Sequence, residues 1–355
     1  MTDLFENPLG TCGFGFVEFT SPQPEELGLL FEKMGFTAVS KHKTKDVVRY
    51  KQGEANFLLN RETSGQAKAF RDLHNGGASA MCFLMEDASS AHVGALERGA
   101  KDFAAGCWAE GLPALQGIGG SVLYLLSQSN LESFFADQFA PILGADEAEN
   151  NLDFFYIDHL THNVHRGQME KWGKFYEDIF GFRQIRYFDI EGKLTGLISK
   201  AMTSPCGKIR IPINESRDDK SQIEEFLTDF NGEGIQHIAI ESRDVIRSVD
   251  GLLANGLELQ DTPDSYFDGI DARLPGHGEN VEELRKRRIL IDGAPTEGQG
   301  LLLQIFSKTV IGPVFFEFIQ RKGNDGFGEG NFQALFDSIE QDQIERGVLE
   351  DTTTQ

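Results

Sequence analysis

The sequence predicts an α+β fold made of two similar halves, with mixed and mostly antiparallel sheets. Two observations predict it: a strand–helix unit ending in Gly-Phe occurs once in each half, and so does a second strand–helix unit. The chain has 355 residues, of which 40% are hydrophobic, and this is enough for two domains with substantial cores.

The first repeated unit consists of an apolar strand, an amphipathic helix and a second strand. It covers residues 13–41 and again residues 154–187. Both helices carry apolar residues at i, i+3 and i+4 spacing. Both are followed by Gly-Phe, at Gly35 and Gly181, as expected where a glycine terminates a helix.

The second repeated unit is a strand followed by a helix, at residues 79–99 and 235–256. The repeat predicts an N-terminal domain at about residues 1–150 and a C-terminal domain at about 151–355, joined by the acidic stretch 146–151. Further short strands are expected at residues 47–50, 55–59, 194–198, 209–213 and 300–306.

Three later segments have patterns of their own. Ser221 and Glu224 match a capping box, so a helix should begin there. Residues 263–288 are polar and mixed. A helix is expected from Gly330 onward, after the glycine-rich stretch 323–330.

Composition limits the partners of the protein. The formal net charge of −23 disfavours binding to nucleic acid and to anionic membrane surfaces. The four cysteines lie far apart and form no C-x-x-C motif, so neither a disulfide framework nor a zinc knuckle is expected. The sequence shows no signal peptide and no transmembrane-length apolar stretch. We therefore expect a cytoplasmic protein.

Two histidines and a glutamate stand in apolar, strand-like segments of the second half: His159, His237 and Glu317. Burying such side chains is costly unless something pairs with them. One metal ion bound by all three would explain them, and a set of two histidines and one carboxylate suits non-haem Fe(II). Two plainer interpretations remain open: hydrogen-bonded core histidines, and an ion pair of Glu317 with Arg321 or another base.

Neighbouring histidines complicate this interpretation, because His159, His162 and His165 form an H-x-x-H-x-x-H pattern. Strand alternation should turn His159 and His162 to opposite faces, which argues against a cluster of adjacent histidines.

The first half offers an internal comparison. Its strand at 13–19 has no histidine, Met81 stands near the place of His237, and the strand at 121–126 has no acid. Only the second half should therefore bind the metal.

Four segments carry a resemblance to a known family: residues 312–340, with the glycine-rich hinge, and residues 157–164, 230–239 and 301–306. Through these, the chain resembles the 4-hydroxyphenylpyruvate dioxygenases, members of the vicinal oxygen chelate superfamily. The resemblance covers essentially the whole chain. It implies two domains of βαβββ units in half-barrels: a metal-free N-terminal scaffold, and a C-terminal catalytic domain with a C-terminal lid helix.

The resemblance also implies a site. Fe(II) would be held by His159, His237 and Glu317, and Asn214, Gln236 and Gln304 would be the catalytic polar residues. The expected substrate-binding residues are Ser199, Asn214, Gln222, Gln236, Gln304, Phe306, Phe315, Phe327, Phe332 and Phe336. The substrates would be O₂ and a 2-oxo acid, 4-hydroxyphenylpyruvate, and the products homogentisate and CO₂. A homo-oligomer, dimer or tetramer, is usual in such families.

Three other functions are compatible with the same fold. In 4-hydroxymandelate synthase the position of Asn214 tends to be apolar, so Asn214 favours the dioxygenase. A non-catalytic binding module would not need an intact metal set. A glyoxalase-like isomerase or an extradiol ring-cleaving enzyme would not need the motif at 312–340.

Overall fold

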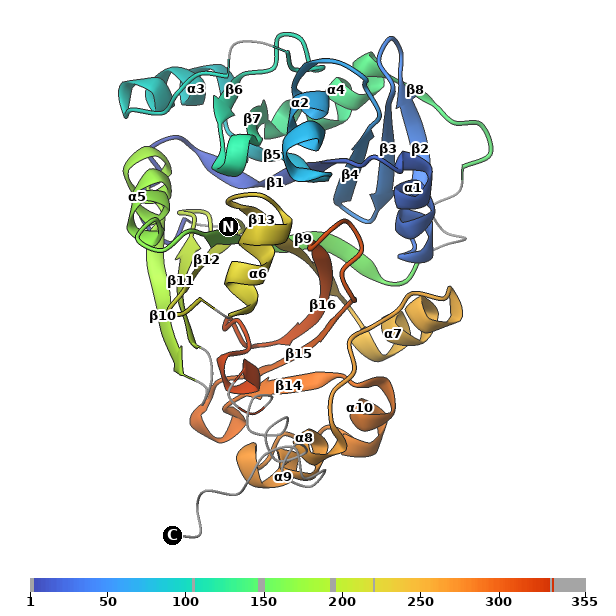
Figure 1. Cartoon of the computed structure of the whole chain (residues 1–355), viewed down its shortest axis with the longest axis vertical. Helices are drawn as coiled ribbons and strands as arrows, with labels where there is room; N and C mark the ends of the chain where they lie inside the picture. The colour runs from blue at the N-terminus through green and yellow to red at the C-terminus, as the bar shows by residue number, and fades with distance from the viewer. Residues whose placement is uncertain are drawn as a thin grey trace.

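The computed structural model describes residues 3–103, 106–145, 151–191, 196–219, 221–332 and 334. They form two eight-stranded mixed sheets, one from each half of the chain, with helices packed against them (Figure 1). The predicted α+β class is confirmed, and one sheet from each half is compatible with the predicted two-fold repeat.

The first sheet has the strand order β6-β7-β5-β1-β4-β3-β2-β8. Its strands are β1 (Thr11–Thr20), β2 (Thr37–His42), β3 (Val47–Gln52), β4 (Ala55–Asn60), β5 (Gly77–Met85), β6 (Ala114–Gln116), β7 (Val122–Ser127) and β8 (Phe139–Pro141). The helices of this half are α1 (Pro24–Lys33), α2 (Gly65–His74), α3 (Ala88–Glu97) and α4 (Leu131–Gln138), with short 3-10 turns η1 (Ile118–Gly120) and η2 (Gln128–Asn130).

The second sheet has the order β10-β11-β12-β9-β13-β16-β15-β14. Its strands are β9 (Phe154–Val164), β10 (Arg183–Glu191), β11 (Gly196–Thr203), β12 (Arg210–Ser216), β13 (Gly234–Ser242), β14 (Leu290–Gly293), β15 (Leu301–Phe306) and β16 (Phe315–Lys322). The helices are α5 (Met169–Phe180), α6 (Gln222–Asp229), α7 (Val245–Ala254), α8 (Asp264–Asp268), α9 (Ile270–Arg273) and α10 (Val281–Arg287), with the 3-10 turn η3 (Pro295–Glu297).

Several local predictions can be compared with these elements. Helix α5 ends at Gly181, which has φ +73°, and α6 is capped by the Ser221 side chain, which accepts from the Glu224 amide. The mixed stretch 263–288, for which we predicted no element, contains the short helices α8, α9 and α10. Of the expected C-terminal helix only its start near residue 329 is described, and the rest lies outside the described residues.

The two sheets share one hydrophobic core. Phe316 of β16 lies against Phe19, Phe31 and Phe57 of the first half, with ring centroids 5.9, 6.4 and 5.7 Å away. Edge-to-face and tilted contacts of this kind bury large apolar areas. The strand that carries Glu317 is therefore fixed in place by the first half.

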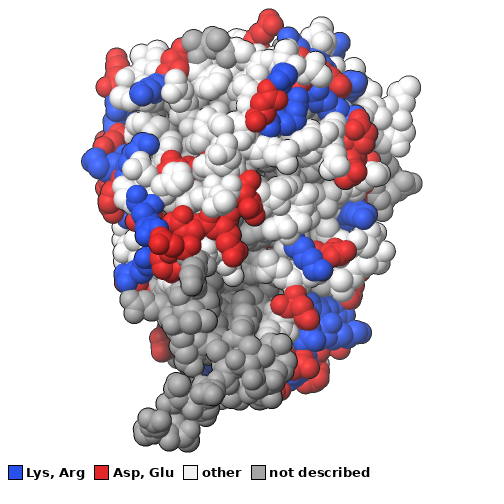
Figure 2. Space-filling model, viewed as in Figure 1, with Lys and Arg blue, Asp and Glu red and all other residues white. Residues whose placement is uncertain are grey.

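The surface is acidic overall, with the net charge of −23. On the described part of the face in Figure 2, Lys and Arg side chains are interspersed with Asp and Glu. Among the described helices, none combines the length and the apolar character that crossing a bilayer requires.

A buried histidine also joins the halves. His74, at the end of α2, lies 2.8 Å from the Phe230 carbonyl oxygen and 2.7 Å from that of Gly119, and its ring stacks on Phe230. Buried polar groups that lose their partners cost about 1–3 kcal/mol each. His74 therefore contributes to the contact between the two halves.

We expect His74→Ala to lower the free energy of unfolding by about 2–3 kcal/mol, since the polar contacts of the ring with two carbonyl oxygens and its stacking on Phe230 are lost. Urea unfolding followed by circular dichroism measures this. His92→Ala is the matched control, because His92 pairs with Asp102 near the surface, and it should change stability little. Equal effects of both variants would contradict a special role of His74.

Candidate metal centre

Three neighbouring strands of the second sheet bring two histidines and a glutamate together. His159 lies on β9, His237 on β13 and Glu317 on β16. Ala239 of the central strand pairs with His159 on one side and with Glu317 on the other, and His237 precedes it by two residues. Residues paired across strands, or two apart along one, share a face. The three side chains therefore point to the same side of the sheet.

The distances bring these groups within reach of a single ion. One ligand-type atom from each residue lies within 4.8 Å of the others, and all three side chains are buried. Nε2 of His159 lies 3.0 Å, and Nε2 of His237 3.3 Å, from Oε2 of Glu317. The alternative pairing of Glu317 with Arg321 is not what the structure has, since Arg321 pairs with Asp158.

Ala239 keeps the space between the three side chains open. It is fully buried and lies directly between His159 and Glu317 on the shared face. Its methyl group is short enough for side chains from both neighbouring strands to meet above it. A larger residue here would occupy the position of an ion.

Two β-bulges place a hydrogen-bond acceptor beside each histidine. The pairing of β9 with β13 skips Asp158, just before His159, and Gln236, just before His237. Each bulge lets adjacent side chains approach one another, which regular alternation prevents. Oδ1 of Asp158 lies 2.8 Å from Nδ1 of His159, and Oε1 of Gln236 lies 3.0 Å from Nδ1 of His237.

These acceptors fix the tautomers. An ionised carboxylate oxygen and an amide oxygen can only accept, so both imidazoles carry a proton on Nδ1. In a neutral imidazole the Nε2 lone pair then faces the carboxylate of Glu317. Lone pairs that face each other at 3.0 and 3.3 Å repel unless a proton or a metal cation lies between them. The donor set therefore fits a metal ion, for which neutral imidazole nitrogen and carboxylate oxygen are ordinary ligands.

The pKa values follow from the same contacts. Burial would raise the pKa of Glu317, but the two imidazoles outweigh burial and lower it to about 2, so the group is a carboxylate at neutral pH. Burial would lower the pKa of His159, but Glu317 and Asp158 outweigh that effect and raise it. Burial does lower the pKa of His237. A proton on His159 is the competitor that a metal ion must displace.

Asp158 is itself held by two arginines. Nε and Nη2 of Arg321 both lie 2.8 Å from its carboxylate oxygens, and Nη1 of Arg210 lies 2.9 Å away. Burial would raise the pKa of Asp158, but the guanidinium groups outweigh burial and hold it well below its ordinary value. Asp158 thus stays ionised and orients His159, as carboxylates beside metal-binding histidines commonly do.

A cavity of about 40 Å³ adjoins the three residues. Of the residues predicted to bind substrate, it is lined by Ser199, Asn214, Gln304, Phe306, Phe327 and Phe332. Phe315 lies behind His237, with stacked rings 4.9 Å apart, and Gln236 adjoins the site through His237. Gln222 is exposed at the start of α6 and is not among the lining residues. Phe336 lies outside the described residues.

Sequence reasoning missed four lining residues: Thr161, Phe188, Leu197 and Pro212. Thr161, Leu197 and Pro212 stand two positions from His159, Ser199 and Asn214 on their strands, so strand alternation could have found them. Phe188 pairs with Ser199 across β10 and β11, which no local pattern predicts.

His162 points away from the site, as strand alternation predicted. Its Nε2 lies 2.7 Å from the hydroxyl of Tyr176 in helix α5, and burial lowers its pKa to about 3. It is a neutral core histidine. His165 is exposed at the end of the strand.

Comparison with known proteins identifies the family. The family model "Hydroxyphenylpyruvate dioxygenase, HPPD, N-terminal" matches residues 5–139, and that of the Glyoxalase/Bleomycin resistance protein/Dioxygenase superfamily matches residues 156–270. Hemolysin VllY of Vibrio vulnificus is 53% identical over 350 residues, which cover 97% of this chain and 98% of that protein. The 4-hydroxyphenylpyruvate dioxygenase of Pseudomonas aeruginosa is also 53% identical over 350 residues, 97% of each chain. The chain belongs to the 4-hydroxyphenylpyruvate dioxygenase family.

A solved structure of a 4-hydroxymandelate synthase mutant from Streptomyces coelicolor shares the fold, with a TM-score of 0.77. It is 23% identical and covers 94% of this chain and 99% of that one. At this identity the likeness concerns the fold alone. The vicinal oxygen chelate architecture expected of the family is confirmed.

The first half of this family member repeats the strands of the metal centre with other side chains. Cys82 pairs with Phe16 and Tyr124, as Ala239 pairs with His159 and Glu317. Two residues before Cys82 stands Ala80, at the place of His237. The nearby Met81 suggested by the sequence is one residue off. Apolar and aromatic side chains thus fill the three ligand positions.

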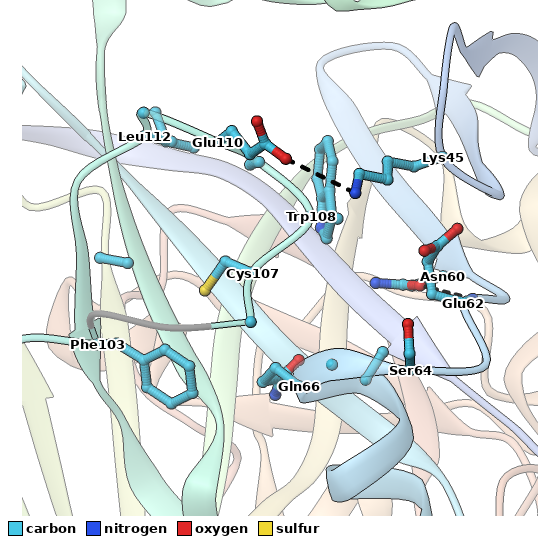
Figure 3. Close-up of a pocket in the computed structure, with 16 residues that line it drawn as sticks. Lys45, Asn60, Glu62, Ser64, Gln66, Phe103, Cys107, Trp108, Glu110 and Leu112 are labelled. Carbon is cyan, nitrogen blue, oxygen red and sulfur yellow. Dashed lines mark hydrogen bonds and ion pairs between the residues drawn. The ribbon is translucent and has the colours of Figure 1, made fainter.

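A larger cavity of about 500 Å³ remains in the first half. Asn60, at the end of β4, lines it, and by strand register Asn60 corresponds to Asn214 of the metal side. Figure 3 shows Trp108 and Cys107 facing this cavity from one loop, and Gln66 and Ser64 from the start of α2. The first half therefore keeps a cavity near the corresponding end of its sheet, but its described residues lack the ligand set.

We expect His237→Ala to weaken Co(II) or Fe(II) binding by more than about 100-fold, since one of three protein ligands is lost. His162→Ala, the matched control on the opposite face, should retain metal binding. Metal content after anaerobic loading and dialysis measures both. Metal lost in the His162 variant and retained in the His237 variant would refute the ligand set.

We expect Ala239→Leu to weaken metal binding about 10-fold or more while the protein still folds, because the added carbons occupy the space between the ligands. Anaerobic calorimetric titration with Co(II) gives the affinity, and circular dichroism checks the fold. Cys82→Leu, at the corresponding position of the first half, is the control and should leave the affinity unchanged. Wild-type affinity in the Ala239 variant would contradict this geometry.

Proposed function

We propose that this protein uses Fe(II), held by His159, His237 and Glu317, to convert 4-hydroxyphenylpyruvate and O₂ to homogentisate and CO₂. Full-length similarity to 4-hydroxyphenylpyruvate dioxygenase, at 53% identity, is the main support for the reaction. The buried set of two histidines and one carboxylate supports the metal, because this set leaves one face of an octahedral ion open.

The bound iron would supply open positions for the 2-oxo acid and for O₂ and would pass electrons between them. The substrate itself would supply the electrons that reduce O₂, through loss of CO₂ and oxidation of its ring. The protein keeps the ligands in the required state. Asp158 and Gln236 hold the Nδ1 protons of the two histidines, so that both Nε2 atoms stay available. Gln304 donates to Oε1 of Glu317 and leaves Oε2 toward the histidines.

The cavity walls suit an aromatic anion. Phe306, Phe327 and Phe332 surround the site with apolar surface, which excludes water from reactive species. Ser199 and Asn214 are cross-strand neighbours that line the same cavity. A neutral hydroxyl and amide can hydrogen-bond a phenol without adding charge.

The same proposal assigns a different role to each half of the chain. The first half, about residues 1–150, would be a scaffold without metal, and the second half, about 151–355, the catalytic domain. Homo-oligomerisation stays a prediction from the family resemblance, and a cytoplasmic location stays a prediction from the sequence.

A product assay tests the function. Apo-protein loaded with Fe(II) and ascorbate should consume O₂ with 4-hydroxyphenylpyruvate and yield homogentisate, identified by chromatography. His237→Ala under the same conditions is the control and should yield none. Formation of 4-hydroxymandelate would select the synthase, and metal binding without O₂ uptake would select a non-catalytic module.

A further inference from the structure

The cavity beside the metal centre is small. Its volume is about 40 Å³, on a measure by which one water molecule needs roughly 10–15 Å³, so it holds a few water molecules. An aromatic 2-oxo acid has many more atoms than that, so its entry requires movement of a wall. Strands of the second sheet contribute the other lining residues, but Phe327 and Phe332 come from the segment that follows β16. This segment is the wall that can move without breaking strand pairing.

Asn331 connects the segment to the metal centre. Its Nδ2 donates to Oε1 of Gln304 at 2.9 Å, and Nε2 of Gln304 donates to Oε1 of Glu317 at 3.2 Å. Asn331 and Gln304 are both at least 98% buried. Gly328 packs so closely on Gln304 that a Cβ there would lie 1.8 Å from Oε1. The segment thus rests directly on the residue that orients Glu317.

Tyr266 of helix α8 holds the other side of Asn331. Its hydroxyl lies 2.5 Å from Oδ1 of Asn331, and it accepts from Nη2 of Arg273 and from the Ile291 amide, both at 2.9 Å. The two donors fill the lone pairs of the hydroxyl, so its single proton goes to Asn331, because the Ile291 carbonyl oxygen is farther away at 3.1 Å. Burial raises the pKa of Tyr266 to about 12, which keeps this proton in place.

We propose that Tyr266 is a positioning residue that latches the segment 327–332 closed over the metal centre, through Asn331 and Gln304. Helix α8 and strand β14, which carries Ile291, lie at the end of the molecule opposite the first half (Figure 1). This latch rests on the proposed function, and its contacts are what stabilises the closed state of the segment. By linkage, a ligand that orders the side chains of Gln304 and Glu317 also favours closure of segment 327–332, and closure of the segment favours that ordering in return.

Tyr266→Phe removes the hydroxyl and keeps the ring. Amide hydrogen exchange of residues 323–332, measured by mass spectrometry on the protein without added metal, should become about 10-fold faster. KM for 4-hydroxyphenylpyruvate should rise about 5- to 10-fold with kcat changed less than about 2-fold, because the closed complex loses stability and no group touching substrate is lost. Unchanged exchange in this segment would overturn the proposal.

Tyr176→Phe is the matched control. Its hydroxyl is equally buried and bonded, to Nε2 of His162, but it belongs to a helix on the other face of the sheet. It should leave the exchange of 323–332 and KM as in the wild type. A similar loosening in both variants would indicate general destabilisation and would also overturn the latch.

Asn331→Ala keeps the proposal testable if the first variant folds poorly, and should speed exchange in the same segment. Combined with Tyr266→Phe it should have no more effect than the larger single change, because both break one chain of bonds. If the fold-changes in exchange rate of the two single variants multiplied in the double variant, the two residues would act independently, and this would contradict a single chain of hydrogen bonds. Since exchange needs neither iron nor turnover, a wild-type protein that makes no homogentisate would refute the proposed function and leave the latch result standing.

Discussion

The ionised carboxylate of Glu317, buried between two imidazoles, is the interaction on which the rest of the second half depends. A buried charge is tolerated only when it is paired and fully hydrogen-bonded. Oε2 faces both histidines and Oε1 accepts from Gln304. From there the contacts extend outward in two directions, through Asp158 to its arginines and through Gln304 to the segment after β16. The geometry of the centre is therefore set by groups that never touch an ion.

The two halves show how one scaffold can host or exclude such a centre. The strand order around the central pair is the same in both, and so is the register that brings three positions together. In the second half those positions carry histidine, histidine and carboxylate. In the first half they carry Phe16, Ala80 and Tyr124, and the rings of Phe16 and Tyr124 lie 5.8 Å apart. The half with the ligand set and the half without it thus differ at these positions by a few side chains.

The sequence was sufficient for the fold class and for the convergence of His159, His237 and Glu317, because strand patterns and a long family motif carry that information. It could not supply the bulges at Asp158 and Gln236, since a bulge depends on how one strand pairs with another. Gln222 was expected in the pocket from the family resemblance alone, and its side chain is exposed at the start of α6. The short helices between residues 264 and 287 also escaped notice, because their burial of Tyr266 and Leu284 depends on distant strands.

Phe316 adjoins Glu317 on β16 and packs into aromatic rings of the first half. Alternation turns these neighbours to opposite faces, so one strand displays a ligand on one surface and anchors an aromatic cluster on the other. An isolated C-terminal half would expose that cluster to water and lose the backbone support of its carboxylate. The half that carries no ligand at the corresponding positions therefore still supports the metal centre, through the strand that it holds from behind.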